Sequence, residues 1–310
     1  MSSAIARQQE LTTSGAAQTG AALAEAFRRV DRHTPWQLTD TTTLRFPTHH
    51  PQGLVLTPDR IFLSSVEILE PTKTHPAPEG RHDRTPGRGR GHLFVMDSGG
   101  DLLEDIRLGH GDAYHPGGID WDGTDVWVPV SEYRPHSSAL ICAVDATTLE
   151  VRRQFEVADH IGGIVKDRQS GHLVGHTWGS RRFVEWNIRG RQLRAWPNGN
   201  GLVDYQDGQY AATSAMICAG VATLPQTPSA GGADAAYELG GVALIDIATQ
   251  RLVHEIPFQR WSTAGHVATR NPFAIRLDGD RLTVRVAPDN GDEGRGTQIL
   301  TYEAVVRPGR

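Results

Sequence analysis

A short motif with a glycine at its fourth position recurs along this chain. The four copies are His50-Pro51-Gln52-Gly53, His115-Pro116-Gly117-Gly118, His160-Ile161-Gly162-Gly163 and Tyr205-Gln206-Asp207-Gly208. A fifth segment, Asn271-Pro272-Phe273-Ala274, keeps the frame with alanine in place of glycine. The first positions are 65, 45, 45 and 66 residues apart, and about 45 residues is the length of one four-stranded propeller blade. The sequence therefore predicts a repeat protein whose two longer units carry extra loops.

Strand-like segments can be placed in each unit, separated by residues that favour turns. In the second unit the expected strands are Gly117–Asp122, Asp125–Glu132, Ala139–Asp145 and Glu150–Val157. The fifth unit has room for only three, Ala274–Leu277, Leu282–Ala287 and Thr297–Ala304. The segment Trp36–Phe46, ahead of the first unit, has the alternation of a strand and is expected to fill the gap. Because ring closure removes exposed sheet edges, we predict an all-β, five-bladed propeller closed by its N-terminal strand.

The 310 residues are expected to form one domain over residues 36–306, with an extension at 1–35 and a tail at 307–310. Leu23, Ala26, Phe27 and Val30 follow a helical spacing. They indicate a short amphipathic helix that packs on the propeller or a partner, while disorder up to about residue 20 is an equal alternative. A six-bladed ring would need roughly 40 more residues than the extension supplies.

Composition excludes several classes of function. The formal net charge is −5 and no basic tract is interleaved with aromatic residues, so nucleic acid is not an expected partner. The chain shows neither a secretory signal nor a membrane-length apolar run, which favours a cytoplasmic monomer or homodimer acting on a small molecule. The two cysteines, Cys142 and Cys218, fall on strands of different blades and are expected to be buried, reduced thiols.

The first residue of each motif copy is expected at one rim of the central channel, because the innermost strand of every blade starts there. This set is His50, His115, His160, Tyr205 and Asn271. Three imidazoles converging on one axis are a typical donor set for a divalent metal such as Zn, Fe, Mn, Ni or Cu, with coordination positions left open. We therefore predict His50, His115 and His160 as metal ligands.

Two glutamates strengthen this prediction through their spacing. Glu67 follows His50 by 17 residues, and Glu132 follows His115 by 17 residues. A carboxylate beside each imidazole would accept its second N–H and orient the ring, so both are predicted to support the ligands. Taken alone, each glutamate is more simply a partner for a neighbouring arginine.

Other polar residues are candidates for proton transfer or substrate binding. Proton transfer is assigned to His176, Tyr205 and His266, the last from a long loop that could reach over the rim. Substrate binding is assigned to Arg134, His136, Trp178 and Asn271, with Arg134 suited to a carboxylate.

The segment HPGGIDWDGTDVWVPVSEY at residues 115–133 resembles an uncharacterised propeller family of bacteria and fungi, and HPQG at 50–53 and HIGG at 160–163 extend the likeness. This resemblance implies a propeller over roughly residues 36–306 and brings no agreed activity. More distantly, the architecture looks like six-bladed strictosidine synthases and lactonases and like five-bladed glycosidases. The predicted axial histidines resemble those of carotenoid oxygenases, in their arrangement only.

These observations predict a small-molecule enzyme with an axial, histidine-bound divalent metal that acts as a Lewis acid in a lyase, hydrolase or cyclisation reaction. Three alternatives remain open at this level. The His-Pro-x-Gly motif can be a turn device with no ligand. The same pocket can serve a metal-free acid–base cyclase or lyase. A non-catalytic propeller can bind a ligand or protein through the loops at 70–91 and 225–240.

Overall fold

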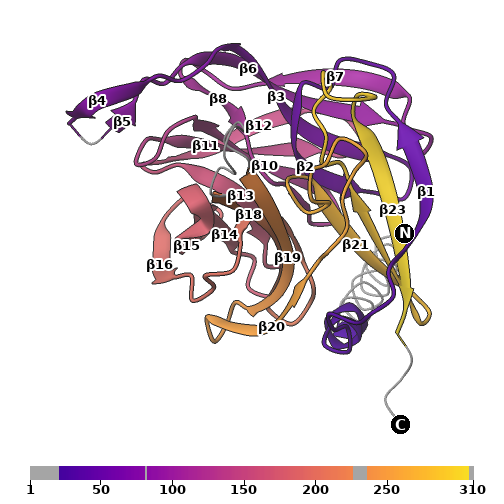
Figure 1. Ribbon diagram of the computed structural model, residues 1–310. Helices are drawn as coiled ribbons and strands as arrows, with labels where there is room; N and C mark the ends of the chain where they lie inside the picture. Colours follow the sequence, from indigo (N-terminus) through magenta and orange to yellow (C-terminus); the bar gives the residue numbers. More distant parts are fainter. Residues whose placement is uncertain (1–20, 81, 226–235, 307–310) are drawn as a thin grey trace, which may run out of the picture.

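The computed structural model describes residues 21–80, 82–225 and 236–306. Five antiparallel sheets surround a common axis and form a five-bladed β-propeller (Figure 1), as predicted from the repeat. The first blade, from the axis outward, consists of β2 (His50–Leu56), β3 (Ile61–Glu70), β6 (Arg88–Met96) and β7 (Leu102–Leu108). The second consists of β8 (Ala113–Pro116) with β9 (Asp120–Trp121), then β10 (Asp125–Glu132), β11 (Ala139–Asp145) and β12 (Val151–Val157).

The remaining blades follow the same order. The third consists of β13 (Ile161–Lys166), β14 (Leu173–Thr177), β15 (Arg182–Trp186) and β16 (Gln192–Pro197), with the 3₁₀ helix η1 (Trp178–Ser180) after β14. The fourth consists of β17 (Asp204–Tyr210), β18 (Ala215–Pro225), β19 (Ala236–Asp246) and β20 (Arg251–Pro257). The fifth consists of β21 (Phe273–Asp278), β22 (Arg281–Val286), β23 (Gln298–Val305) and β1 (Gln37–Thr43).

The N-terminal strand closes the ring, as predicted. β1 pairs antiparallel with β23, from Gln37 opposite Glu303 to Thr43 opposite Gln298. A helix at residues 21–27 precedes it and packs against the fourth and fifth blades through buried Leu23 and Phe27. This matches one of the two alternatives considered for the extension, and residues 1–20 lie outside the described residues.

The two longer units differ from the prediction of simple loops. In the first, β4 (Thr74–Glu79) and β5 (His82–Arg84) form a hairpin that projects from the ring (Figure 1). Arg84 of this hairpin lies over the Trp178 ring in the third blade, 5.1 Å from its centroid. In the fourth unit the extra residues lengthen β18 and β19, which pair as far as Pro225 opposite Ala236.

The innermost strand of the second blade is interrupted, so the predicted continuous strand Gly117–Asp122 was wrong. The interruption arises because Gly118 pairs with the next blade: its N–H donates to the Gly162 carbonyl at 2.9 Å. A β-carbon on Gly117 would lie 2.2 Å from that same carbonyl oxygen. The backbones of neighbouring innermost strands are thus too close for side chains, and this requires glycine.

Asp207, the third residue of the fourth motif copy, is buried at the centre of the ring. Its carboxylate accepts four backbone N–H groups: those of Leu54 (2.9 Å), Phe273 (2.9 Å), Ile119 (3.0 Å) and Gly208 (2.9 Å). The donors come from the first, fifth, second and fourth blades. One side chain therefore holds the innermost segments of four blades together.

Each hydrophobic cluster of the described residues lies between two adjacent blades. Leu63 and Phe94 of the first blade pack with Ile299 of the fifth, and Trp127 of the second blade packs with Trp186 of the third. Full burial of such side chains contributes about 1.5–3 kcal/mol each. Cys142 and Cys218 are buried free thiols, as predicted.

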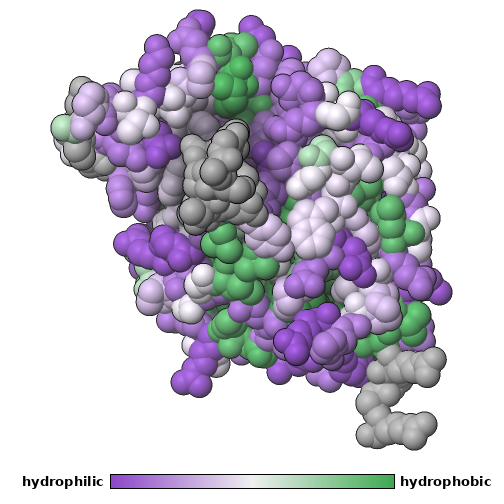
Figure 2. Space-filling view, viewed as in Figure 1, coloured by the Kyte–Doolittle hydropathy of each residue, from purple (hydrophilic) through white to green (hydrophobic). Residues whose placement is uncertain are grey.

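The face of the molecule shown in Figure 2 is largely hydrophilic, and its hydrophobic residues lie in separate small groups. Within the described residues, no helix has the length and apolar character needed to span a membrane.

Replacing Asp207 with asparagine is expected to destabilise the fold strongly. The amide NH₂ would face two backbone N–H groups that lose their acceptor, and each unsatisfied buried donor costs about 1–3 kcal/mol. Urea denaturation should show a loss of roughly 2–6 kcal/mol in the free energy of unfolding. Asp145→Asn is the matched control, because Asp145 accepts two N–H groups in an exposed turn. Equal, small losses in both variants would contradict the central role of Asp207.

Candidate functional site

The five residues that open the motif copies all line one cavity of about 240 Å³ at the axis, namely His50, His115, His160, Tyr205 and Asn271. His115 lies on β8 and His160 immediately precedes β13, so successive blades bring their imidazoles to the same place. Other lining residues are Gln52, Tyr133, His176, Trp178, Asp204 and Gln206. Of these, His176 and Trp178 were predicted as site residues, whereas Tyr133, Asp204 and the two glutamines were not.

The histidine rings lie close together and against aromatic side chains. The ring of His115 lies 6.5 Å from that of His50 and 6.3 Å from that of His160, measured between centroids. Tyr133 stacks on His115 at 4.3 Å with an interplanar angle of 12°. Trp178 meets His160 edge-on at 4.8 Å. Imidazole rings thus line the cavity, and the aromatic rings of Tyr133 and Trp178 pack against them.

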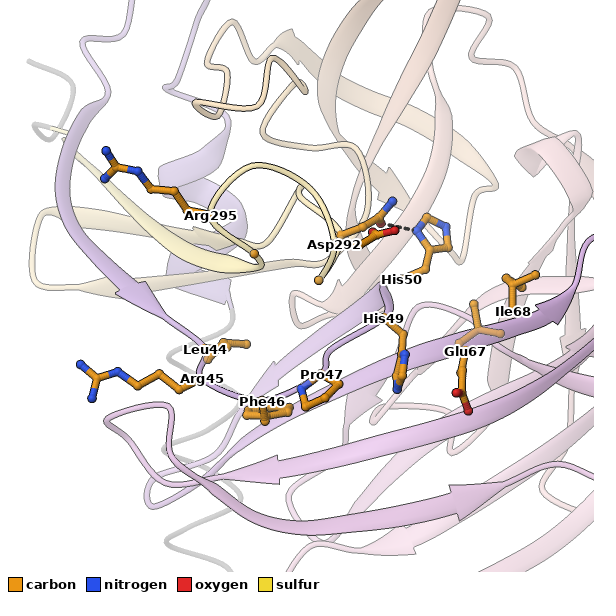
Figure 3. Close-up of a pocket in the computed structure, with 14 residues that line it drawn as sticks. Leu44, Arg45, Phe46, Pro47, His49, His50, Glu67, Ile68, Asp292 and Arg295 are labelled. Atoms are coloured by element: carbon orange, nitrogen blue, oxygen red, sulfur yellow. Dashed lines mark hydrogen bonds between the residues drawn. The ribbon is translucent and has the colours of Figure 1, made fainter.

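Hydrogen bonds fix the tautomers of two of these histidines. The Nδ1 of His160 donates to the backbone carbonyl of Glu132 at 2.8 Å, because a carbonyl can only accept. The Nδ1 of His50 donates to Asn290 Oδ1 at 2.6 Å, the dashed line in Figure 3. The Asn290 amide is itself oriented, since its Nδ2 donates to Glu293 Oε1 at 2.9 Å. In both histidines Nε2 is left as an unprotonated lone pair, the form that binds a metal or accepts a proton.

Four buried polar atoms that line this cavity have no hydrogen-bond partner among the described residues. They are Nε2 of His115, both ring nitrogens of His176 and Nδ2 of Asn271. Buried polar groups are almost always paired, and an unpaired one costs about 1–3 kcal/mol. Their concentration here makes this cavity the candidate functional site.

All four cavity histidines are held in the neutral state by their surroundings. Burial is the largest cause, and it lowers the pKa of His160 and of His176 to about 4. Burial lowers the pKa of His115 well below its usual value, and the adjacent His160 and His50 lower it further. Burial also lowers the pKa of His50, opposed by its hydrogen bond to Asn290. Neutral imidazoles are suitable as ligands or bases near pH 7 but not as acids.

The glycines of the third motif copy make room for His176. A β-carbon on Gly163 would lie 2.4 Å from His176 Nε2, and one on Gly162 would lie 3.1 Å from Cε1 of the same ring. The imidazole therefore lies close against this stretch of backbone. The motif glycine thus serves the cavity as well as the close approach of the strands.

The two glutamates do not place their carboxylates on the histidines. Glu67 pairs with Arg90 at 3.0 Å and lies 3.9 Å from His92. The Glu132 carboxylate pairs with Arg134 at 2.6 Å and accepts from Ser138, so only its backbone carbonyl reaches His160. The equal offset of 17 residues put both glutamates at equivalent positions of the second strand of each blade, but nearby arginines hold their carboxylates. Asn290, which orients His50, carries no comparable spacing signal.

The other predicted residues are distributed over two regions. Tyr205 lines the cavity, but its hydroxyl accepts a hydrogen bond from Asn200 Nδ2 at 2.6 Å, and burial raises the pKa of its phenol. Arg134 and His136 are absent from the cavity lining among the described residues, and His136 is exposed. His266 also lies outside that lining and contacts Glu238 and Glu293 instead.

A wider groove of about 870 Å³ adjoins the cavity (Figure 3). His50 lines both spaces, and the groove continues past His49 and Glu67 to Asp292 and Arg295. Two groups of described residues near it have metal-ligand spacing, His49 with Glu67 and His92, and His266 with Asp289 and Glu293.

Comparison with known proteins shows the family of this chain. The sequence matches a family of unknown function, DUF6454, over residues 12–308. The chain belongs to this family. No curated protein matches it.

Solved structures similar to this DUF6454 chain have very low sequence identity. The tail fiber of Staphylococcus aureus phage P68 is 9% identical, with a TM-score of 0.50 over 89% of this chain and 53% of the fiber. This chain therefore spans about half the length of that protein. Luciferin-regenerating enzyme is 8% identical, with a TM-score of 0.46 over 87% of this chain and 99% of its own. At these identities a likeness concerns the fold alone.

The donor set of this DUF6454 chain suits a metal ion in chemistry but not in distance. Among the described residues, the three histidines are not one of the groups whose ligand atoms all lie within 4.8 Å of one another. The Nε2 atoms of His50 and His160 are free lone pairs, and that of His115 is buried without a partner. Imidazoles on one tetrahedral ion, with metal–nitrogen bonds of about 2.0–2.1 Å, have centroids roughly 5 Å apart. The ring separations of 6.5 and 6.3 Å from His115 exceed this value, so a shared ion would require the three rings to move toward one another.

Acid is expected to destabilise the metal-free protein through these histidines. An unfolded histidine binds a proton below about pH 6.5, whereas folded His160 and His176 bind one only near pH 4. Between these values the unfolded state holds more protons, so stability falls as pH falls, by about 1.4 kcal/mol per pH unit for each histidine. Above pH 6.5 this contribution is absent.

The measurement is urea denaturation from pH 6.5 to 4.5 in the presence of a chelator. His176→Gln should lower the slope of stability against pH by about 1.4 kcal/mol per unit, and His136→Gln is the exposed-histidine control. A His176→Gln slope equal to that of the unmodified protein would show that His176 is not held neutral.

Proposed function

We propose that this protein is a metal-dependent enzyme acting on a small polar molecule in the axial cavity, with His50, His115 and His160 as the protein ligands. The observation that carries the proposal is the set of unpartnered buried nitrogens at the meeting point of three blades, above all Nε2 of His115. Core histidines that only stabilise a fold use their nitrogens in hydrogen bonds. Here burial keeps the rings neutral, while Asn290 and the Glu132 carbonyl set two tautomers.

A divalent ion held there would supply Lewis acidity toward a substrate oxygen or a more acidic bound water, which suits a lyase, hydrolase or cyclisation reaction. Three protein ligands would leave positions open for substrate.

The chain's own side chains define how a substrate would be held. Asn271 lines the cavity and its Nδ2 is a buried donor without a hydrogen-bond partner among the described residues, and the amides of Gln52 and Gln206 add donors and acceptors. Trp178 and Tyr133 provide an aromatic wall, with their rings tilted by 43° to each other. At about 240 Å³ the cavity is below the usual range for drug-sized ligands, so the substrate is expected to be small.

Two residues are placed to accept a proton in this cavity. His176 is neutral with a pKa of about 4 and has both nitrogens unpartnered. Asp204 lines the cavity and pairs with Arg181; burial raises the pKa of its carboxyl, and Arg181 opposes this. We assign proton transfer to this pair in preference to Tyr205, because burial raises the pKa of its phenol.

The metal-free acid–base alternative is less compatible with the electrostatics. Such a reaction needs a protonated group as the acid near neutral pH, and the buried histidines are neutral there.

Metal analysis tests the proposal directly. Protein purified without a chelator or a histidine tag should contain near-stoichiometric metal at the axial site, and His115→Ala should lose that equivalent while remaining folded by circular dichroism. His254→Ala is the control, because His254 bonds the Val30 carbonyl outside the cavity. Less than a tenth of an equivalent at the axial site, after attempts at reconstitution, would exclude the metal-dependent enzyme.

A further inference from the structure

We propose that His266, Asp289 and Glu293 form a second divalent-cation site, separate from the axial cavity. Each offers one ligand atom, and these atoms all lie within 4.8 Å of one another. His266 Nε2 lies 3.3 Å from Glu293 Oε2. None of the three residues lines the axial cavity, so this inference does not depend on the proposed function.

The histidine of this cluster is oriented in the way typical of metal-bound imidazoles. Its Nδ1 contacts Glu238 Oε1 at 3.0 Å, and the other oxygen of Glu238 accepts the Val267 N–H at 2.7 Å. Glu238 is therefore held in place by the backbone and can take the Nδ1 proton of His266. A carboxylate in this position fixes the tautomer and turns Nε2 toward the ion.

The charge of the cluster is unbalanced without a cation. Glu238, Asp289 and Glu293 supply three carboxylates, and among the described residues around them Arg270 is the one guanidinium in contact, 3.3 Å from Glu293 and 3.7 Å from Glu238. Asp289 is only 3% exposed, and its Oδ1 accepts from Ser262 Oγ. Buried carboxylates are normally paired or bound to metals, so a divalent ion would offset the excess charge.

The donor types narrow the class of ion. One imidazole and two carboxylates combine the nitrogen donor that suits Zn²⁺ with the oxygen donors that suit Mn²⁺. Ca²⁺ takes six to eight oxygen ligands, which this set does not provide. We therefore infer a first-row divalent ion, with Mn²⁺ and Zn²⁺ as the probes.

Glu293 connects this site to the axial histidines. Its Oε2 faces His266, while its Oε1 accepts from Asn290 Nδ2, and Asn290 in turn holds His50. Binding of an ion by Glu293 would therefore affect the His50 ring through the side-chain amide of Asn290. His266 and Glu293 lie on different loops, before β21 and after β22, and their contact depends on the packing of these two loops.

The test uses the full-length His115→Ala variant, freed of metal with chelator and desalted, so that the axial site cannot contribute. Titration with Mn²⁺, followed by electron paramagnetic resonance, and with Zn²⁺, followed by calorimetry, should each show about one bound ion. Adding Asp289→Asn, which keeps an oxygen acceptor for Ser262, should weaken binding at least tenfold. Adding Glu238→Gln should weaken it by about 10–100-fold, as expected for a positioning residue.

His172→Ala in the same background is the matched control. His172 pairs with Glu185 at 2.6 Å but belongs to no three-residue metal-ligand group among the described residues, so its loss should leave the affinity unchanged. Thermal unfolding of each variant verifies the fold.

The two sites can fail separately. Binding that is absent in the His115→Ala background, or unaffected there by Asp289→Asn and Glu238→Gln, would overturn the second site. Metal that survives His115→Ala in full but is lost with Asp289→Asn would support the second site and count against the axial one.

Discussion

The arrangement of the whole ring depends on one buried carboxylate. Asp207 accepts N–H groups from the innermost segments of four blades, so those segments must converge to within hydrogen-bond distance of two oxygen atoms. Burial raises the pKa of this carboxyl, and the four N–H groups oppose that effect. Where backbones approach so closely, side chains are excluded, and Gly53, Gly117 and Gly118 have no space for a β-carbon. The motif glycine and the central aspartate are thus two parts of one constraint.

The repeat predicted most of the architecture because blade length and strand alternation are local properties of a sequence. The five blades, the closing strand β1 and the gathering of His50, His115 and His160 at one place all followed from motif spacing. The β4–β5 hairpin did not, because its pairing lies outside the repeat. The repeat pattern also could not predict which side chains pair across blades. Asn290, 240 residues from His50, took the place expected for Glu67, since a spacing rule cannot say which of several nearby groups an arginine will hold.

The proposed axial and second sites share a chain of polar contacts. His266, Glu293, Asn290 and His50 follow one another at distances of 3.3, 2.9 and 2.6 Å. This ordering makes the long loops before and after β21 and β22 part of the site's support rather than simple connections. Such supporting residues commonly determine how firmly a ligand is positioned.

The pairing of β1 with β23 has a consequence for synthesis of the protein. Gln37 and Glu303 are partners that lie far apart in the sequence, so β1 leaves the ribosome long before its partner β23. Until then the fifth blade cannot be completed, and its edge is open to pairing with other chains. Contacts of such long sequence separation slow folding. The β1–β23 pairing that closes the ring therefore also removes the open sheet edge through which a nascent chain could associate with other chains.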